Sequence, residues 1–474
     1  MVSDVLASTT STSAESDRVT LKAVVRGAGP SGLAASIALA QSGFDVQVVE
    51  KRPSRPLGHG RKNMVALRPE ALRKLDHLGA LRYALSSEVK NGNLGCITRM
   101  SGGRTTSQID GSAFEWPLKR YPGAEPPDSI SNVQKDEYEI PDKINEQVPS
   151  SFINLGDLED CLAQAATDLG VTVVYDATVH LTPSECSNTF SATLERSTGT
   201  STSLGTPDLV VCASGKNDHV LSDQLNIRRK SCVILSDADL VTPTESNEPL
   251  ALRLPANGDE SLESQLYSVF GVQDRSLTMG TLEHVVRKHT SGPNRIPQPL
   301  VEIQMQHATA AHLILQHPRS DPPLHSDAQA LENYILERIN ARLSTSYTSV
   351  QHLKDCGKLV WGDPLAPITV ETVTAPQFVY GDNTILIGDC AMSCSPSSGL
   401  GADIGMTVDS QSVRGLAEAF RDANGNDHER IKQALAQFNR SKAESAVIWS
   451  QGSRMYYLTS READDILKRQ AGGE

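Results

Sequence analysis

Apolar and polar positions near the start of the chain predict a strand, a helix and a second strand. Residues 23–26 form a short apolar run typical of a buried strand, and residues 44–49 predict another. Between them, Leu33 and Ile37 recur at helical spacing, and Gly43 follows the last turn. This order predicts a βαβ unit with its two strands parallel in one sheet.

The turn from the first strand into the helix carries the pattern G-x-G-x-x-G, formed by Gly27, Gly29 and Gly32. The first glycine allows a tight turn, the second leaves room for a pyrophosphate beside the backbone, and the third lets helix and strand pack closely. Pro30 and Ser31 stand at the helix start, where free N–H groups and the positive dipole end favour phosphate. The pattern, with both strands at the expected spacing, predicts a dinucleotide site rather than an ordinary glycine-rich turn.

An acidic residue, Glu50, ends the second strand, where a carboxylate can accept hydrogen bonds from a ribose diol. A basic loop rich in proline and glycine follows and begins at Lys51. Arg61 and Asn63 adjoin the apolar residues 64–67 and are the better candidates for contacts with a cofactor. Simple solvent exposure explains Lys51, Arg52 and Arg55 at least as well as ligand binding does.

The middle of the chain changes character twice. Residues 96–150 are polar and broken by prolines, which is typical of a lid or an inserted loop. Residues 152–169 return to helical spacing, and residues 171–179 read as a strand. Residues 228–374 contain short strand-like stretches with proline-rich connections, which predict a separate unit built on an antiparallel sheet.

A second glycine-rich turn appears late in the chain, after a predicted strand at 383–388. Asp389 ends that strand, and a helix is expected over about 402–420. The residues between them that we take as cofactor-binding candidates are Pro396, Gly399, Leu400 and Gly401. Another helix N-terminus would then point at the ligand held by the first, with N–H groups that stabilise negative charge.

These elements predict an α/β fold with a discontinuous, Rossmann-like dinucleotide-binding domain and an inserted α+β domain. We assign residues 1–20 to a disordered tail and residues 96–150 to a polar insertion or lid. The first domain takes 21–95, 151–227 and 375–427; the substrate domain takes 228–374; helices fill 428–474.

Composition removes several classes of function. The net charge of −13 argues against nucleic acid as a partner, because phosphate backbones need a basic face. No window approaches 18 uncharged apolar residues, so we expect no membrane span, and the N-terminus lacks a secretory signal. The eight cysteines form no C-x-x-C pair, which predicts no metal site and reduced thiols in a cytoplasmic protein.

Together, the early glycine motif, the turn at 208–215 and the late G-D turn resemble the class A flavoprotein monooxygenases of the p-hydroxybenzoate hydroxylase fold. Residues 50–81, with EKR and then R-x-N before a leucine-rich helix, look closest to the MICAL branch. The likeness spans about 22–81, 152–215 and 384–420, and the middle of the chain carries no recognisable signature.

The resemblance implies that the chain binds extended FAD, with Gly27 to Gly32 at the pyrophosphate, Glu50 at the adenosine ribose and Asp389 at the ribityl chain. Arg61 and Asn63 would lie near the flavin. NADPH (or NADH) would reduce the flavin, and molecular oxygen would form a C4a-hydroperoxyflavin that oxygenates a small-molecule substrate. The cofactor carries this chemistry, so no catalytic side chain is assigned.

Three residues depart from the family pattern. The central D-G turn is here Ser214-Gly215, the histidine usual after the late G-D is Met392, and Gly156 stands near the place of an arginine. The acid of the D-G turn is linked in the family to FAD and NADPH handling, so the departures bear on flavin reduction more than on FAD binding.

The function predicted first is therefore hydroxylation or epoxidation of a small organic molecule of the secondary-metabolite type. The altered D-G turn keeps a second reading open, in which the protein is an FAD-dependent dehydrogenase, reductase or cyclase without net oxygen insertion. A flavin-binding sensor is a third reading, although nothing in the chain resembles an output domain.

Overall fold

The computed structural model describes the chain in segments. These are residues 20–57, 59–61, 63–67, 69–85, 98–99, 104–107, 151–184, 187–227, 230–231, 264–273, 282–286, 301–307, 310–318, 327–340, 345–366, 368–371, 373–394, 400–423 and 427–455. Pro396, Gly399, most of the predicted lid and almost all of the predicted N-terminal tail lie outside these residues.

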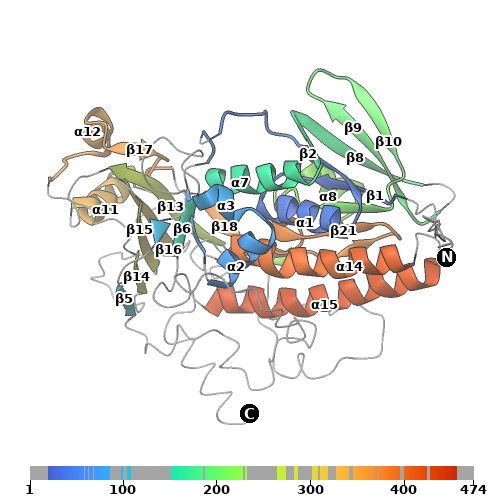
Figure 1. Ribbon diagram of the computed structural model, residues 1–474. Helices are drawn as coiled ribbons and strands as arrows, with labels where there is room; N and C mark the ends of the chain where they lie inside the picture. The colour runs from blue at the N-terminus through green and yellow to red at the C-terminus, as the bar shows by residue number, and fades with distance from the viewer. Residues whose placement is uncertain are drawn as a thin grey trace, which may run out of the picture.

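A mostly parallel sheet is the centre of the molecule (Figure 1). Its strands lie in the order β20-β21-β11-β1-β2-β7. Their bounds are β1 Lys22–Arg26, β2 Asp45–Glu50, β7 Thr172–Tyr175, β11 Leu209–Cys212, β20 Val379–Tyr380 and β21 Thr384–Leu386. β1 pairs in parallel with β2 on one side and β11 on the other, so the two strands of the predicted βαβ unit are neighbours.

Helices from distant parts of the sequence pack together beside this sheet. α1 (Pro30–Gln41) contacts α7 (Leu155–Asp168) and α14 (Ser410–Asp422), and α14 contacts α15 (His428–Met455). One buried core joins all these elements, from Leu21 to Ala446. The shorter helices are α2 Pro69–His77, α3 Leu81–Leu85 and α8 His219–Gln224. The predicted C-terminal helices begin with α15, and residues 456–474 lie outside the described chain, while the predicted division into domains stays a prediction.

Two predicted elements are divided in the structure. Residues 151–154 are a strand, β6 (Ser151–Asn154), and the helix begins only at Leu155. The single strand expected at 171–179 is broken at Asp176, whose φ of 57° is left-handed, and the chain continues as β8 (Ala177–Pro183). β8 then pairs with β9 (Phe190–Arg196), and β10 (Ser201–Gly205) completes a small antiparallel sheet. Hydrophobicity alone could not locate these breaks, because the apolar pattern runs through both of them.

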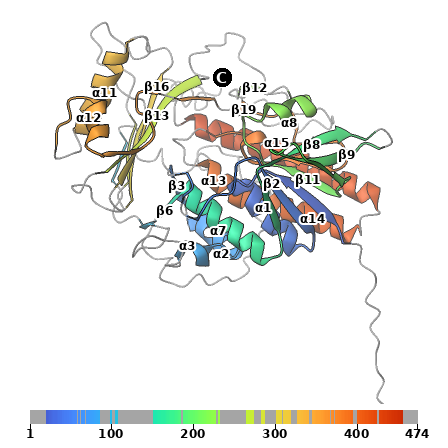
Figure 2. The same cartoon turned by 90° about the horizontal axis from the view of Figure 1, so that it is seen from above.

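The inserted domain is built on a larger sheet in the order β17-β13-β16-β15-β14-β5, with β18 beside β13. β13 pairs antiparallel with β16, β17 and β18, as predicted for this region. The bounds are β5 Arg104–Ser107, β13 Ser264–Gln273, β14 Leu282–Val286, β15 Val301–His307, β16 Ala310–Pro318, β17 Leu359–Trp361 and β18 Ile368–Glu371. α11 (Ala328–Asn340) and α12 (Val350–Asp355) lie beside this sheet, apart from the central one (Figure 2), and share a second buried core with it.

The chain crosses between the two domains at a short pair of strands. β12 (Lys230–Ser231) pairs antiparallel with β19 (Val373–Thr374), close to the predicted boundaries at 228 and 374. Parts of the predicted lid are strands rather than loop: β4 (Thr98–Arg99) pairs with β6, which also pairs with β3 (Met64–Leu67), and β5 joins the large sheet. Within the described residues, no helix has both the length and the apolar character needed to cross a bilayer.

Candidate flavin site

The three glycines of the turn after β1 differ in their surroundings: two are closely packed against the backbone, and one faces open space. A side chain on Gly27 would lie 2.6 Å from the carbonyl oxygen of Ala213, and Gly27 has a φ of +108°. A side chain on Gly32 would lie only 2.0 Å from the carbonyl oxygen of Gly27. A side chain on Gly29, in contrast, would meet nothing within 4 Å. The middle glycine therefore leaves free the space into which a phosphate could enter.

The first turn of α1 faces that space with backbone donors. Gly29 is its N-cap, Pro30 is its first residue, and no side chain caps the helix. N–H groups at a helix start have no partner within the helix, and they carry the positive end of the dipole. The start of α1 therefore suits a pyrophosphate, as the sequence predicts.

Glu50 lies beside this turn at the end of β2. Its side chain is almost fully buried; Oε2 accepts from the Ala28 N–H at 2.8 Å, and Oε1 accepts from the Arg52 N–H at 2.9 Å. Burial alone would raise the pKa of Glu50, but the hydrogen bonds from Arg52 and Ala28 outweigh it, so the pKa is lowered. Glu50 is thus a carboxylate at neutral pH, and its contact with a ribose stays a prediction from the sequence.

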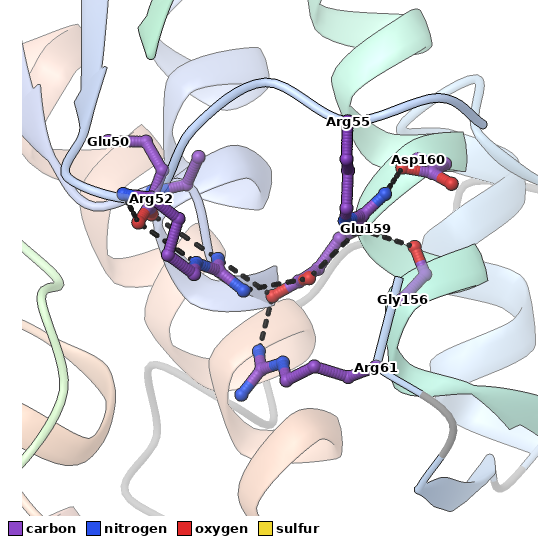
Figure 3. A network of polar contacts seen from close by, with 8 residues as sticks. Glu50, Arg52, Arg55, Arg61, Gly156, Glu159 and Asp160 are labelled. Atoms are coloured by element: carbon purple, nitrogen blue, oxygen red, sulfur yellow. Dashed lines mark hydrogen bonds and ion pairs between the residues drawn. The ribbon is translucent and has the colours of Figure 1, made fainter. Parts of the chain in front are cut away.

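A cluster of three arginines extends from Glu50 to helix α7 (Figure 3). Arg52 spans the gap, with contacts to Glu50 and, at 3.1 Å, to Glu159. Arg55 and Arg61 reach the same Glu159 carboxylate, and Arg55 also contacts Asp160. From the sequence alone, solvent exposure explains Arg52 and Arg55 at least as well as ligand binding does. The structure instead ties both to acidic groups that are themselves buried.

Of the remaining candidates in this loop, Lys51 is exposed to solvent. Arg61 and Asn63 contact α7 through their backbones: the Arg61 carbonyl accepts from the Gly156 N–H at 3.0 Å, and the Asn63 carbonyl from the Leu155 N–H at 2.8 Å. A side chain at Gly156 would lie 2.5 Å from the Arg61 nitrogen. This crowding explains why an arginine has no room at Gly156.

The late turn meets the early one at Ser31. A side chain at Gly388 would lie 2.8 Å from Ser31 Oγ, and one at Gly405 would lie 2.0 Å from the same atom. Asp389 follows Gly388, and one of its carboxylate oxygens is 3.9 Å from the place of a Gly401 side chain. α13 (Leu400–Ile404) begins there. The two predicted helix starts therefore converge.

The other two departures from the family pattern also adjoin this site. Gly215 has a φ of +85°, and the turn that carries it begins at Ala213, whose N–H donates to the Arg26 carbonyl. Met392 is buried, and its N–H donates to the Gly388 carbonyl at 2.9 Å. Both departures thus lie in backbone that supports the two turns.

Sequence reasoning did not find the acidic partners in this region. Glu159 and Asp160 stand on a helix whose spacing reads only as one apolar face and one polar face. Arg26, next to Gly27, is likewise buried and paired with Asp218, which also caps α8. A buried charge at the end of an apolar strand is the signal that could have revealed Arg26, because such charges are rare without a partner.

Comparison with known proteins agrees with this geometry. Residues 20–232 match the model of a protein family described as an FAD binding domain. No curated protein matches the chain by sequence.

Several solved structures share the fold over almost the whole chain. One is p-nitrophenol 4-monooxygenase PnpA from Pseudomonas putida DLL-E4, with 14% identity, a TM-score of 0.57, and coverage of 96% of this chain and 94% of that one. A variant of Klebsiella pneumoniae HpxO complexed with FAD has 16% identity, a TM-score of 0.53, and coverage of 96% and 95%. A variant of 2-methyl-3-hydroxypyridine-5-carboxylic acid oxygenase has 17% identity, a TM-score of 0.52, and coverage of 95% and 93%.

At these identities, the likeness of the structures shows the fold, and the family match shows the FAD-binding domain. Both confirm the FAD-binding fold expected from the three motifs, while the local likeness to the MICAL branch stays a prediction. The chain contains an FAD-binding domain over residues 20–232 and has the fold of the class A flavoprotein monooxygenases.

Proposed function

We propose that the protein is an FAD-dependent monooxygenase that consumes NADPH or NADH and hydroxylates or epoxidises a small organic molecule. The observation that carries this proposal is the convergence of the α1 start, Glu50 and the Gly388–Asp389 turn around the open space at Gly29. When bound, FAD would supply the electron transfer and the oxygen chemistry.

The side chains of the site would act by binding and orientation. The N–H groups at the start of α1 would hold the pyrophosphate, Glu50 the adenosine ribose, and Asp389 the ribityl chain. Arg52 would influence how Glu50 binds the ribose. Two of its side-chain nitrogens contact Glu50, and its guanidinium also contacts Glu159. To accept both ribose hydroxyls, Glu50 would have to exchange part of its contact with Arg52.

The substrate would bind between the flavin and the inserted domain, whose large sheet is supported by its own core. A secondary-metabolite substrate and a cytoplasmic location belong to this proposal. The location is supported by five free cysteines in the described part of the chain, since reduced thiols persist in that compartment.

The test is a screen of aromatic and polyketide-like molecules for faster NADPH or NADH oxidation by the FAD-loaded protein, with oxygen uptake recorded. A product that gains one oxygen atom from isotopically labelled dioxygen is the expected result. Substrate turnover with no oxygen gained would instead establish a dehydrogenase, reductase or cyclase, which the Ser214-Gly215 turn keeps open.

A further inference from the structure

A buried lysine of the C-terminal helix reaches the late turn through one carboxylate. Lys442 of α15 forms an ion pair with Asp409, and the side chains of the two residues are 2% and 0% exposed. Removal of one partner of a buried ion pair is strongly destabilising, so this contact helps to hold Asp409 in place.

Asp409 uses its other oxygen for the backbone of the late turn. Oδ2 accepts from the Gly388 N–H at 2.7 Å, and Gly388 holds a left-handed φ of +61° immediately before Asp389. The same carboxylate therefore connects α15 to the residue that precedes the predicted ribityl ligand.

The segment that carries Asp409 is unusual in its own right. Residues Gly405–Asp409 form a π-helical turn between α13 and α14, and such turns are frequent at functional sites. Gly405, at its other end, packs against Ser31 at the start of α1. The π turn thus contacts both halves of the candidate flavin site and presents Asp409 to Lys442.

We propose that Lys442 is a positioning residue for FAD, which holds Asp409 against the Gly388 N–H and so directs Asp389 towards the cofactor. The inference rests on the proposed function only where it places FAD beside Asp389. It adds that α15, which contains none of the predicted cofactor ligands, is coupled to cofactor binding. Coupling of binding free energies is reciprocal, so FAD must in turn stabilise α15.

Two double variants separate positioning from simple stabilisation. K442M/D409N and K442M/D409L both remove the two buried charges with side chains of similar size, and only the asparagine keeps an oxygen that can accept from the Gly388 N–H. We expect K442M/D409N to bind FAD within threefold of the wild type and K442M/D409L at least tenfold more weakly, measured by quenching of FAD fluorescence. Equal affinity of the two double variants would overturn the proposal.

The single variant K442M tests the lysine itself, because it leaves the Asp409 carboxylate buried without its cation. We expect FAD affinity at least tenfold below that of K442M/D409N. If K442M does not fold, the comparison of the double variants still tests the contact of residue 409 with the Gly388 N–H, and the hydrogen exchange of α15 described next tests the connection to that helix.

Hydrogen exchange gives a readout away from the cofactor. Addition of FAD should slow amide exchange in α15 of the wild type, and this protection should be lost in K442M/D409L. An α15 that exchanges equally with and without FAD would contradict the coupling. A wild-type protein that binds no FAD would instead refute the proposed function, so the two failures are distinguishable.

Discussion

The two hydrophobic cores differ in how much of the chain contributes residues to each. The core around the parallel sheet joins elements from Leu21 to Ala446, including the first strand and the last helix. The core of the inserted domain draws on residues from Phe270 to Leu359, mainly one strand and two helices. Cofactor candidates lie in the first unit alone, so we expect damage there to affect FAD and damage in the second to spare it.

The largest expected effect is at Gly32, in the core that carries the cofactor site. In G32A the new methyl group would lie 2.0 Å from the Gly27 carbonyl oxygen, a backbone atom that cannot move without shifting the turn. We expect a loss of more than about 3 kcal/mol in stability, with no FAD-binding protein recovered. G415A is the control, because a side chain there meets nothing within 4 Å. Thermal unfolding measures the stability of both variants. A G32A protein as stable as G415A would contradict the packing described.

A matched isoleucine pair compares the two cores directly. Ile37 of α1 and Ile335 of α11 are both 0% exposed, one in each core. Truncation to alanine should cost about 2–5 kcal/mol in either place. Urea unfolding should show this loss in both variants, while FAD titration should show weakened binding in I37A alone. Equal weakening in I335A would show that the cores do not act separately.

A smaller effect is expected at Glu159, which gathers three arginines beside the cofactor site. In E159Q these arginines lose their common anion, but their side chains are 27–47% exposed, so water compensates for part of the loss. We expect the free energy of unfolding to fall by about 1–2 kcal/mol, measured by thermal unfolding, and FAD binding to weaken several-fold. Unchanged FAD affinity would mean that the arginine cluster supports the fold and not the site.

The smallest effect is a dependence on pH at Glu50. Because its folded-state pKa is lowered, Glu50 contributes stability at pH above its ordinary value of 4.5, and this contribution is lost as the pH falls through the folded-state pKa. E50Q should therefore unfold more easily than the wild type at pH 7, by less than about 1 kcal/mol since Arg52 is 38% exposed, and the difference should shrink below pH 4. A difference that stays constant in acid would assign the effect to packing.

The sequence predicted those parts of the fold in which local pattern and structure coincide. The strand and helix of the early glycine turn, the late G-D turn and the antiparallel character of the inserted domain all have such patterns. Glu159 and Lys442 could not be assigned, because helical spacing shows that a residue lies on a face but not which distant segment meets it. The strand break at Asp176 was missed for a similar reason, because a residue with a left-handed backbone does not change the pattern of apolar positions around it.

The central claim, that the open space at Gly29 receives the FAD pyrophosphate, is tested most directly by FAD titration of the wild type and G29A. A methyl group at Gly29 meets no protein atom within 4 Å, so G29A should keep the wild-type melting temperature in the absence of FAD. We predict a yellow wild-type protein that binds one FAD, and an affinity at least tenfold lower in G29A. Wild-type protein that binds no FAD, or G29A that binds it equally well, would contradict the account.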